Sequence, residues 1–225
     1  MKEVKVIVPR SLADITLGQY QKYEAVLAKN EGNEQERFMQ LKMIEIFCGV
    51  DFQTANKMPM IQFSEVCEAG YAVLQERPSF EQTFHLGETE FGFIPDLEQM
   101  TFGEFVDLES FISEIKDMHK AMAVLYRPIK QRVKDKYLIH EYEGDMFHEV
   151  MRSMPLSAAS GSMLFFWNLG IDCLNVILKS SENRELKREF YQRREALLKS
   201  GDGTQQFGNS LALILQDLNQ LRNLE

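Results

Sequence analysis

The chain has 225 residues, of which 44% are hydrophobic and 26% are charged, and its formal net charge is -9 at pH 7. Its 16 Phe, 7 Tyr and 12 Met supply enough apolar surface for a folded core, which excludes a disordered chain. The excess of acidic residues disfavours long-range attraction of the whole chain to DNA or to an anionic membrane.

The N-terminal segment and the cysteines bear on cellular location. Met1–Val6 lacks the apolar run of a signal peptide, and polar residues interrupt the most apolar segment, Met163–Leu178, so we expect a core helix there and no membrane span. Cys48, Cys67 and Cys173 show neither metal-ligand nor disulfide spacing. Free thiols fit a reducing cytoplasm.

The first third of the chain predicts one strand followed by four helices. Val4–Val8 is rich in β-branched residues and stops at Pro9, which predicts a short strand. Thr16 and Gln19 have the spacing of a capping box, in which each side chain bonds the backbone N–H of the other residue. The predicted helices cover residues 17–28, 34–48, 51–57 and 64–75.

The middle of the chain predicts a hairpin and then a long helix. The aromatic segment Thr83–Ile94 contains a turn at Gly87, a residue type that tolerates a positive φ. A second capping box, formed by Thr101 and Glu104, predicts one continuous helix over Phe102–Tyr126.

Beyond this helix, every second residue is basic over a short stretch. The four side chains are Lys130, Arg132, Lys134 and Lys136. On a strand this period places all four on one face. Two interpretations stay open: a face that binds phosphates or an acidic patch on a partner chain, and a charged edge strand that blocks aggregation. DNA binding is less favoured, because only Tyr137 offers a ring on which a base could stack.

The last third predicts a short helix over 145–151, a long helix over 156–179 that begins with a run of small residues, and then an arm over 181–225. Small side chains let another backbone approach closely. The arm is expected to contain a charged helix, a glycine hinge and a last helix. That last helix would place four aliphatic side chains on one face: Leu211, Ile214, Leu218 and Leu221. Such an arm fits either a partner-binding element or a helix that folds back on its own core.

These elements together predict an α+β fold, predominantly α-helical, with a small antiparallel β-sheet. The sheet would combine Val4–Val8, Thr83–Ile94 and Lys130–Ile139. Residues 1–180 would form a single helix-rich domain, and residues 181–225 would form the charged helix, the hinge and the C-terminal interaction helix.

The sequence contains no recognisable catalytic motif. The densest group of possible metal ligands, His140–Glu149, offers His140 and His148 to a metal-dependent hydrolase, but the spacing matches no short zinc motif. A solvated acidic turn is the preferred interpretation. Ser160–Ser162 lacks the glycines of a nucleophile elbow, and Gly201–Thr204 is too short for a phosphate-binding loop. We therefore predict no enzyme, no metal and no cofactor.

Five stretches are similar in order and spacing to a known family. They resemble small structural proteins encoded in the virion gene blocks of tailed bacteriophages, most closely those of crAss-like phages and related marine phages. The similarity covers roughly residues 4–178. The stretches are Glu90–Leu97 with Met100–Glu109, Met118–Ile129, and Met154–Leu156 with Phe165–Gly170.

This resemblance implies a virion component of the head–tail region, such as a ring-forming connector or collar protein below the portal. Its partners would be copies of itself in a homo-oligomeric ring, twelve-fold if it matches the portal, and the portal or other tail and connector proteins. It implies no membrane and no sequence-specific nucleic acid. The protein would be made in the bacterial host cytoplasm and retained in the virion. The same motifs fit a tail assembly chaperone that is not retained in the virion.

Overall fold

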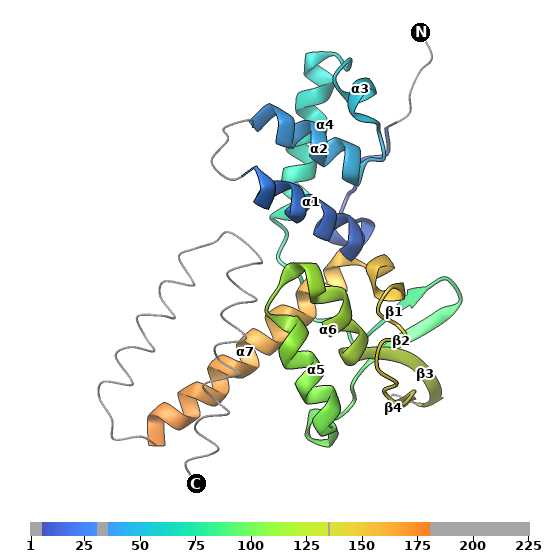
Figure 1. The fold of residues 1–225 in the computed structure, drawn as a ribbon, viewed down its shortest axis with the longest axis vertical. Helices are drawn as coiled ribbons and strands as arrows, with labels where there is room; N and C mark the ends of the chain where they lie inside the picture. Colours follow the sequence, from blue (N-terminus) through green and yellow to red (C-terminus); the bar gives the residue numbers. More distant parts are fainter. Residues whose placement is uncertain (1–5, 31–35, 135, 181–225) are drawn as a thin grey trace.

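The computed structural model describes residues 6–30, 36–134 and 136–180 (Figure 1). These residues form seven α-helices, short 3₁₀ helices and one four-stranded antiparallel sheet, so the prediction of a mainly helical α+β fold is confirmed. Helices α1–α4 gather at one end of the molecule, and the sheet, α5, α6 and α7 lie at the other. The expected arm over 181–225, with its four aliphatic residues, lies outside the described residues.

Four helices make up the N-terminal group. Their bounds are Leu17–Lys29 for α1, Glu36–Phe47 for α2, Phe52–Ala55 for α3 and Met60–Leu74 for α4. The capping box at the start of α1 is confirmed, since Thr16 Oγ1 accepts the Gln19 N–H at 3.2 Å and Gln19 Oε1 accepts the Thr16 N–H at 2.9 Å. Helix α4 begins at Met60, earlier than expected, because Pro59 is well tolerated at a helix start.

The predicted strand at Val4–Val8 is wrong over its described part, since residues 6–8 have no strand conformation. This segment lies beside the helical group, at the far end of the molecule from the sheet (Figure 1). β-Branched residues favour a strand only where a neighbouring strand is available to pack against. The chain forms its first pairing of extended backbone farther on, where the Leu17 N–H donates to Met154 O and the Leu156 N–H donates to Ile15 O, both at 2.8 Å.

The sheet has the order β1-β2-β3-β4, and every neighbouring pair is antiparallel. Its first hairpin, β1 (Thr83–Leu86) and β2 (Thr89–Phe93), confirms the sequence prediction, and Gly87 turns with a φ of 58°. Strand β3 (Tyr126–Val133) then pairs with the other side of β2, and β4 (Lys136–Ile139) forms the edge opposite β1.

The prediction of one strand with four basic residues on one face is wrong. Lys134 adopts a φ of 55° and turns the chain, so that β3 and β4 form a second hairpin. Neither Gly nor Pro marks this turn in the sequence. Lys136 pairs with Val133, which faces the opposite side of the sheet from Arg132. The basic residues therefore surround the hairpin and do not line one face; Lys130 and Arg132 lie on β3, Lys134 in the turn and Lys136 on β4.

The single helix predicted over Phe102–Tyr126 is also wrong. The chain forms α5 (Phe102–Ile112), a 3₁₀ turn, and α6 (Met118–Leu125), and Tyr126 already belongs to β3. The break lies at Glu114, whose backbone is extended with φ −122° and ψ 131°. The capping box at the start of α5 is confirmed, because Thr101 and Glu104 bond each other's backbone N–H.

The last described elements combine one wrong prediction with one confirmed prediction. Residues 144–149 form turns, and a 3₁₀ helix over Val150–Ser153 replaces the predicted helix over 145–151. Helix α7 (Leu156–Ser180) has the expected extent. Its small residues allow a close approach, because a Cβ at Gly161 would lie 2.1 Å from the carbonyl oxygen of Ser79.

Replacing Gly161 by Ala should destabilise the protein, because the new methyl group would overlap backbone atoms of Ser79 that a side-chain rotation cannot move. We expect a loss of about 3 kcal/mol or more in the free energy of unfolding, measured by urea denaturation. Gly103→Ala is the matched control, since no atom lies within 4 Å of its Cβ position. In the helix α5 that substitution should stabilise the protein by about 0.5–1 kcal/mol. Equal effects of the two substitutions would contradict the close contact.

Candidate functional site

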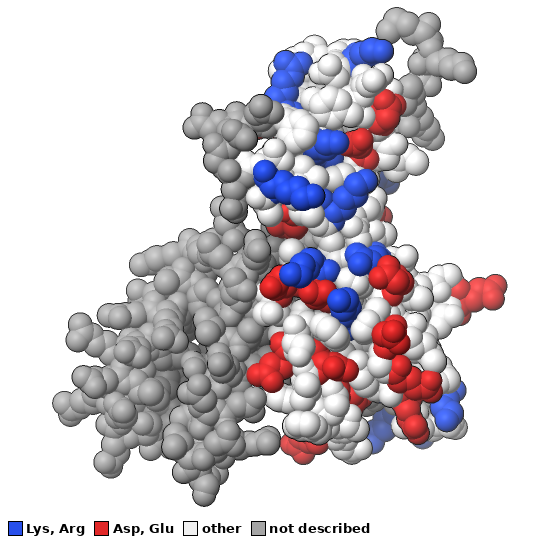
Figure 2. Space-filling view, viewed as in Figure 1, with Lys and Arg blue, Asp and Glu red and all other residues white. Residues whose placement is uncertain are grey.

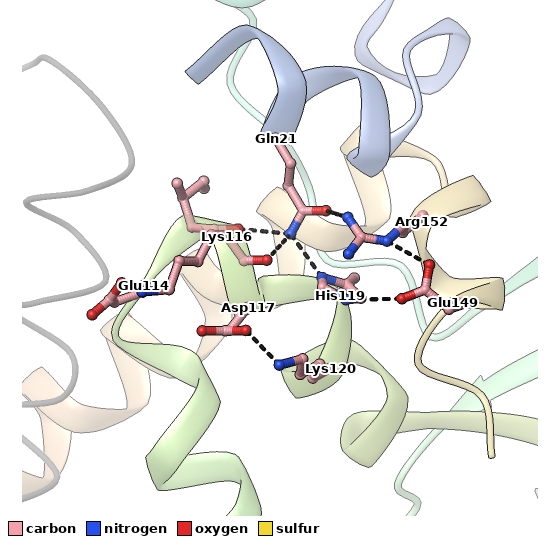
Figure 3. A network of polar contacts seen from close by, with 9 residues as sticks. Gln21, Glu114, Lys116, Asp117, His119, Lys120, Glu149 and Arg152 are labelled. Carbon is pink, nitrogen blue, oxygen red and sulfur yellow. Dashed lines mark hydrogen bonds and ion pairs between the residues drawn. The ribbon is translucent and has the colours of Figure 1, made fainter. Parts of the chain in front are cut away.

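The most connected polar cluster lies between α1 and the break that separates α5 from α6 (Figure 3). Gln21 extends from α1, and its Nε2 donates to the carbonyl oxygens of Ile115 at 2.7 Å and Lys116 at 3.1 Å. Its Oε1 accepts from Arg152 Nη1 at 3.1 Å. Since the two carbonyls can only accept and the guanidinium can only donate, the orientation of the amide is fixed.

The same amide determines the protonation state of His119. Gln21 Nε2 lies 3.0 Å from His119 Nδ1 and shares its two hydrogens between this nitrogen and the two carbonyls; because an amide nitrogen cannot accept, the contact favours an unprotonated Nδ1. The imidazole is therefore neutral and carries its hydrogen on Nε2, which faces Glu149 Oε1 at 3.8 Å. Burial, reinforced by the positive charge of Arg152, lowers the pKa of His119 to about 4.

This cluster joins parts of the fold and does not present reactive groups to a substrate. His119 is only 1% exposed and Gln21 only 6%. Glu149 is the exposed member, and its carboxylate accepts from Arg152 Nε at 2.8 Å. We call Gln21, His119, Glu149 and Arg152, with the two carbonyl groups, the joint network.

Replacing Gln21 by Ala should weaken the joint network, because the two carbonyls, His119 Nδ1 and Arg152 Nη1 would all lose their contact with the amide. We expect the free energy of unfolding to fall by about 2–3 kcal/mol in urea denaturation. Gln62→Ala is the matched control, since Gln62 is an exposed residue of α4. A loss at Gln21 no larger than that at Gln62 would contradict the role assigned to the amide.

The pKa of His119 predicts a pH dependence of stability. Its folded pKa of about 4 lies below the usual 6.5, so the native state favours the neutral ring. This contribution is complete above pH 6.5 and is lost as the pH falls towards 4, amounting to about 2 kcal/mol between pH 7 and pH 5. His119→Asn, which keeps an acceptor near Nδ1, should remove that part of the pH dependence in urea denaturation. The substitution His85→Gln, at an exposed position on β1, is the control. Parallel pH profiles for wild type and His119→Asn would contradict this assignment.

A second buried cluster connects α5 to the sheet. Glu104 Oε1 forms an ion pair with Arg127 Nη1 at 2.7 Å, and both side chains are nearly inaccessible to solvent. The other Glu104 oxygen accepts from the Thr101 N–H at 2.6 Å and from the Thr101 hydroxyl at 2.8 Å. The sequence predicted the helix cap but not the ion pair, because nothing in the spacing of Glu104 and Arg127 indicates contact. The ion pair lies inside the fold, where Arg127 Nε has no hydrogen-bond partner among the described residues.

The candidate metal ligands do not form a centre. His140 is exposed, whereas His148 packs edge-on against Phe111 with ring centroids 5.5 Å apart. Within the described residues, no group of three or more His, Cys, Asp or Glu side chains could hold a metal ion. Burial also raises the pKa of Cys48, to about 11, and that of Cys67. Both thiols are therefore protonated at neutral pH and are poor nucleophiles.

The basic residues of the β3–β4 hairpin differ in their contacts. Arg132 forms an ion pair with Glu90, and its guanidinium lies 5.6 Å from the centroid of the Tyr137 ring. Lys130, Lys134 and Lys136 are exposed and form no ion pair with any described residue. On the face shown in Figure 2, basic side chains predominate over α1–α4 and acidic side chains over the opposite end. The free lysines therefore lie in the more acidic part of the protein.

Large apolar side chains are exposed in pairs at three places on the helices and the sheet, and a fourth pair, Met146 with Val150, lies in the segment after β4. The first three pairs are Met60 (73% exposed) with Ile61 (76%) at the start of α4, Phe102 (82%) with Val106 (39%) on α5, and Val133 (60%) with Leu138 (61%) on the β3–β4 hairpin. Beside Met60, a hollow of about 110 Å³ is lined by Arg37, Leu41 and Phe63 among others. This volume is below the ~300 Å³ at which pockets for small molecules begin, so the hollow better suits a single side chain.

In comparisons with known proteins, no family model, no curated protein and no solved structure was found to match the chain. Among the described helices, none combines the length and the apolar character needed to cross a bilayer.

Proposed function

We propose that the chain is a non-enzymatic structural protein of a tailed phage particle. In this proposal it oligomerises into a ring in the head–tail connector region and bridges neighbouring virion proteins. The observation that carries the proposal is the exposure of three separate apolar pairs, on α4, on α5 and on the β3–β4 hairpin. Aromatic residues and Met are enriched in protein interfaces.

A ring subunit needs contacts on more than one side. In a ring, each copy presents one surface to the next copy and a different surface to the previous one. A bridge to neighbouring proteins needs at least one more surface. Three apolar pairs on separate elements satisfy this requirement, and Phe102, at 82% exposure, is the most exposed of their side chains. The location in a phage particle rests on the resemblance of the sequence alone.

The buried polar side chains bond to other parts of the same fold, which also supports a structural role. Gln21, His119 and Arg152 bond one another between α1, α6 and the 3₁₀ helix over Val150–Ser153. Glu104 and Arg127 neutralise each other between α5 and β3. These groups serve to hold the elements in place, and a rigid subunit is what a repeating assembly requires.

The proposal predicts a closed cyclic oligomer of the purified protein, detected by native mass spectrometry, and density for the chain at the head–tail junction in images of intact particles. Phe102→Asp should weaken one of its contacts by about tenfold or more, because a charge replaces an apolar anchor. Phe102→Tyr is the control, since it keeps the ring. Folding should tolerate both changes because the side chain is exposed.

Two other results would contradict the proposal in different ways. A strictly monomeric protein that is absent from mature virions would exclude it altogether. A protein present in assembly intermediates but absent from mature virions would identify the tail assembly chaperone instead.

A further inference from the structure

The β3–β4 hairpin and the loop that follows it carry opposite charges. The hairpin exposes the free side chains of Lys130, Lys134 and Lys136. The loop over residues 140–150 exposes three acidic side chains besides Glu149, which pairs with Arg152: Glu141, Glu143 and Asp145. None of these six residues forms an ion pair with any described residue. We refer to the two surfaces as the basic hairpin and the acidic loop.

Each surface also carries exposed apolar side chains among its charges. The basic hairpin has Val133 at 60% and Leu138 at 61% exposure, and the acidic loop has Met146 at 55% and Val150 at 43%. Apolar residues surrounded by polar and charged ones are the usual composition of a protein interface. The two surfaces are thus alike in apolar content and opposite in charge.

The acidic loop is held so that its carboxylates stay in solvent. The Tyr142 hydroxyl donates to Asp107 Oδ2 at 2.8 Å, and Phe147 packs edge-on against Phe91 with ring centroids 6.1 Å apart. These side chains point into the fold, whereas Glu141 and Glu143, on either side of Tyr142, are exposed. The loop therefore cannot fold over to neutralise the lysines without breaking its own anchors.

The basic hairpin is fixed in a similar way. The Tyr137 hydroxyl donates to Phe93 O at 2.8 Å, and Arg132 forms the ion pair with Glu90. The Tyr137 ring also occupies the space above Gly92, where a Cβ would lie 2.5 Å from Tyr137 Cε2. Two fixed surfaces lose little conformational entropy when they bind, which favours association.

We propose that the basic hairpin of one copy of this chain docks on the acidic loop of a second copy. The inference rests on the proposed function in requiring self-association, and it assigns the surfaces that meet. The apolar side chains would supply most of the affinity, because exposed ion pairs are individually weak. The charges would select the partner surface and accelerate the encounter. A nucleic acid is the less suitable occupant, because the acidic loop follows β4 directly in the chain and would repel phosphates.

The test uses two triple variants of the full chain. Variant one, K130E/K134E/K136E, makes the hairpin acidic; variant two, E141K/E143K/D145K, makes the loop basic. Each variant alone would bring like charges together at the contact, so each should associate at least about tenfold more weakly than the wild type in analytical ultracentrifugation. When the two variants are mixed in equal amounts, the acidic hairpin of variant one can contact the basic loop of variant two. The native basic hairpin of variant two can likewise contact the native acidic loop of variant one. The mixture should therefore associate again.

Salt provides a second measurement on the wild type. The screening length falls from about 10 Å at 0.1 M to about 3 Å at 1 M ionic strength, so association should weaken as salt is added. All six substituted side chains are exposed, and circular dichroism and urea unfolding check that the variants keep the native fold.

The possible outcomes separate this inference from the proposed function. Association of each variant as strong as that of the wild type, or a mixture that stays dissociated, would overturn the docking and leave a ring built from other surfaces. A closed dimer that follows the charge pattern would support the docking and contradict the ring. A wild type that stays monomeric at all concentrations would overturn both. Binding of a nucleic acid probe that only variant one loses, with self-association unchanged, would assign the lysines to that ligand instead.

Discussion

The amide of Gln21 is the contact on which the arrangement of the two ends of the molecule depends. It belongs to the N-terminal group of helices, yet its hydrogen bonds go to the carbonyls of Ile115 and Lys116 and to Arg152. Both carbonyls lie in the 3₁₀ turn that follows the break between α5 and α6, and the Ile115 carbonyl also accepts the Met118 N–H. The break and the glutamine therefore support each other, because the break brings two carbonyls to the amide and the amide adds a donor to each of them. The neutral state of His119 follows from the same contact.

Local signals predicted much of the fold, and long-range contacts explain the misses. Both capping boxes, the turn at Gly87 and the extent of α7 are encoded within a few neighbouring residues, and all are confirmed. The helix predicted over 102–126 was wrong because the chain breaks at Glu114, next to carbonyls that bond Gln21, a residue far away in sequence. The hairpin turn at Lys134 was missed because a lysine in left-handed conformation leaves no glycine or proline as a marker.

The sequence predicted the charged residues of the basic hairpin and the acidic loop but not their arrangement, which again depends on long-range contacts. The basic residues 130–136 were found from their spacing, but their distribution around two strands depends on a turn that the sequence does not mark. The acidic loop was interpreted from sequence as a solvated turn, and its residues are indeed exposed. What the sequence could not indicate is that Tyr142 and Phe147 hold it in place, because their partners Asp107 and Phe91 lie far back in the chain. The aliphatic stripe over 211–221 lies outside the described residues and stays a prediction.

The pairing of Thr16 with Pro155 has a consequence for the order of folding. Helix α1 leaves the ribosome long before residues 154 and 156, whose backbone groups form the hydrogen bonds to Leu17 and Ile15. The N-terminal helices must wait for most of the described chain to be synthesised before they can dock. During that interval the polar side of α1 that carries Gln21 stays hydrated. Contacts this distant in sequence slow folding, because a long loop must close before they form. The protein thus reaches its final shape late, after the basic hairpin and the acidic loop have both been synthesised.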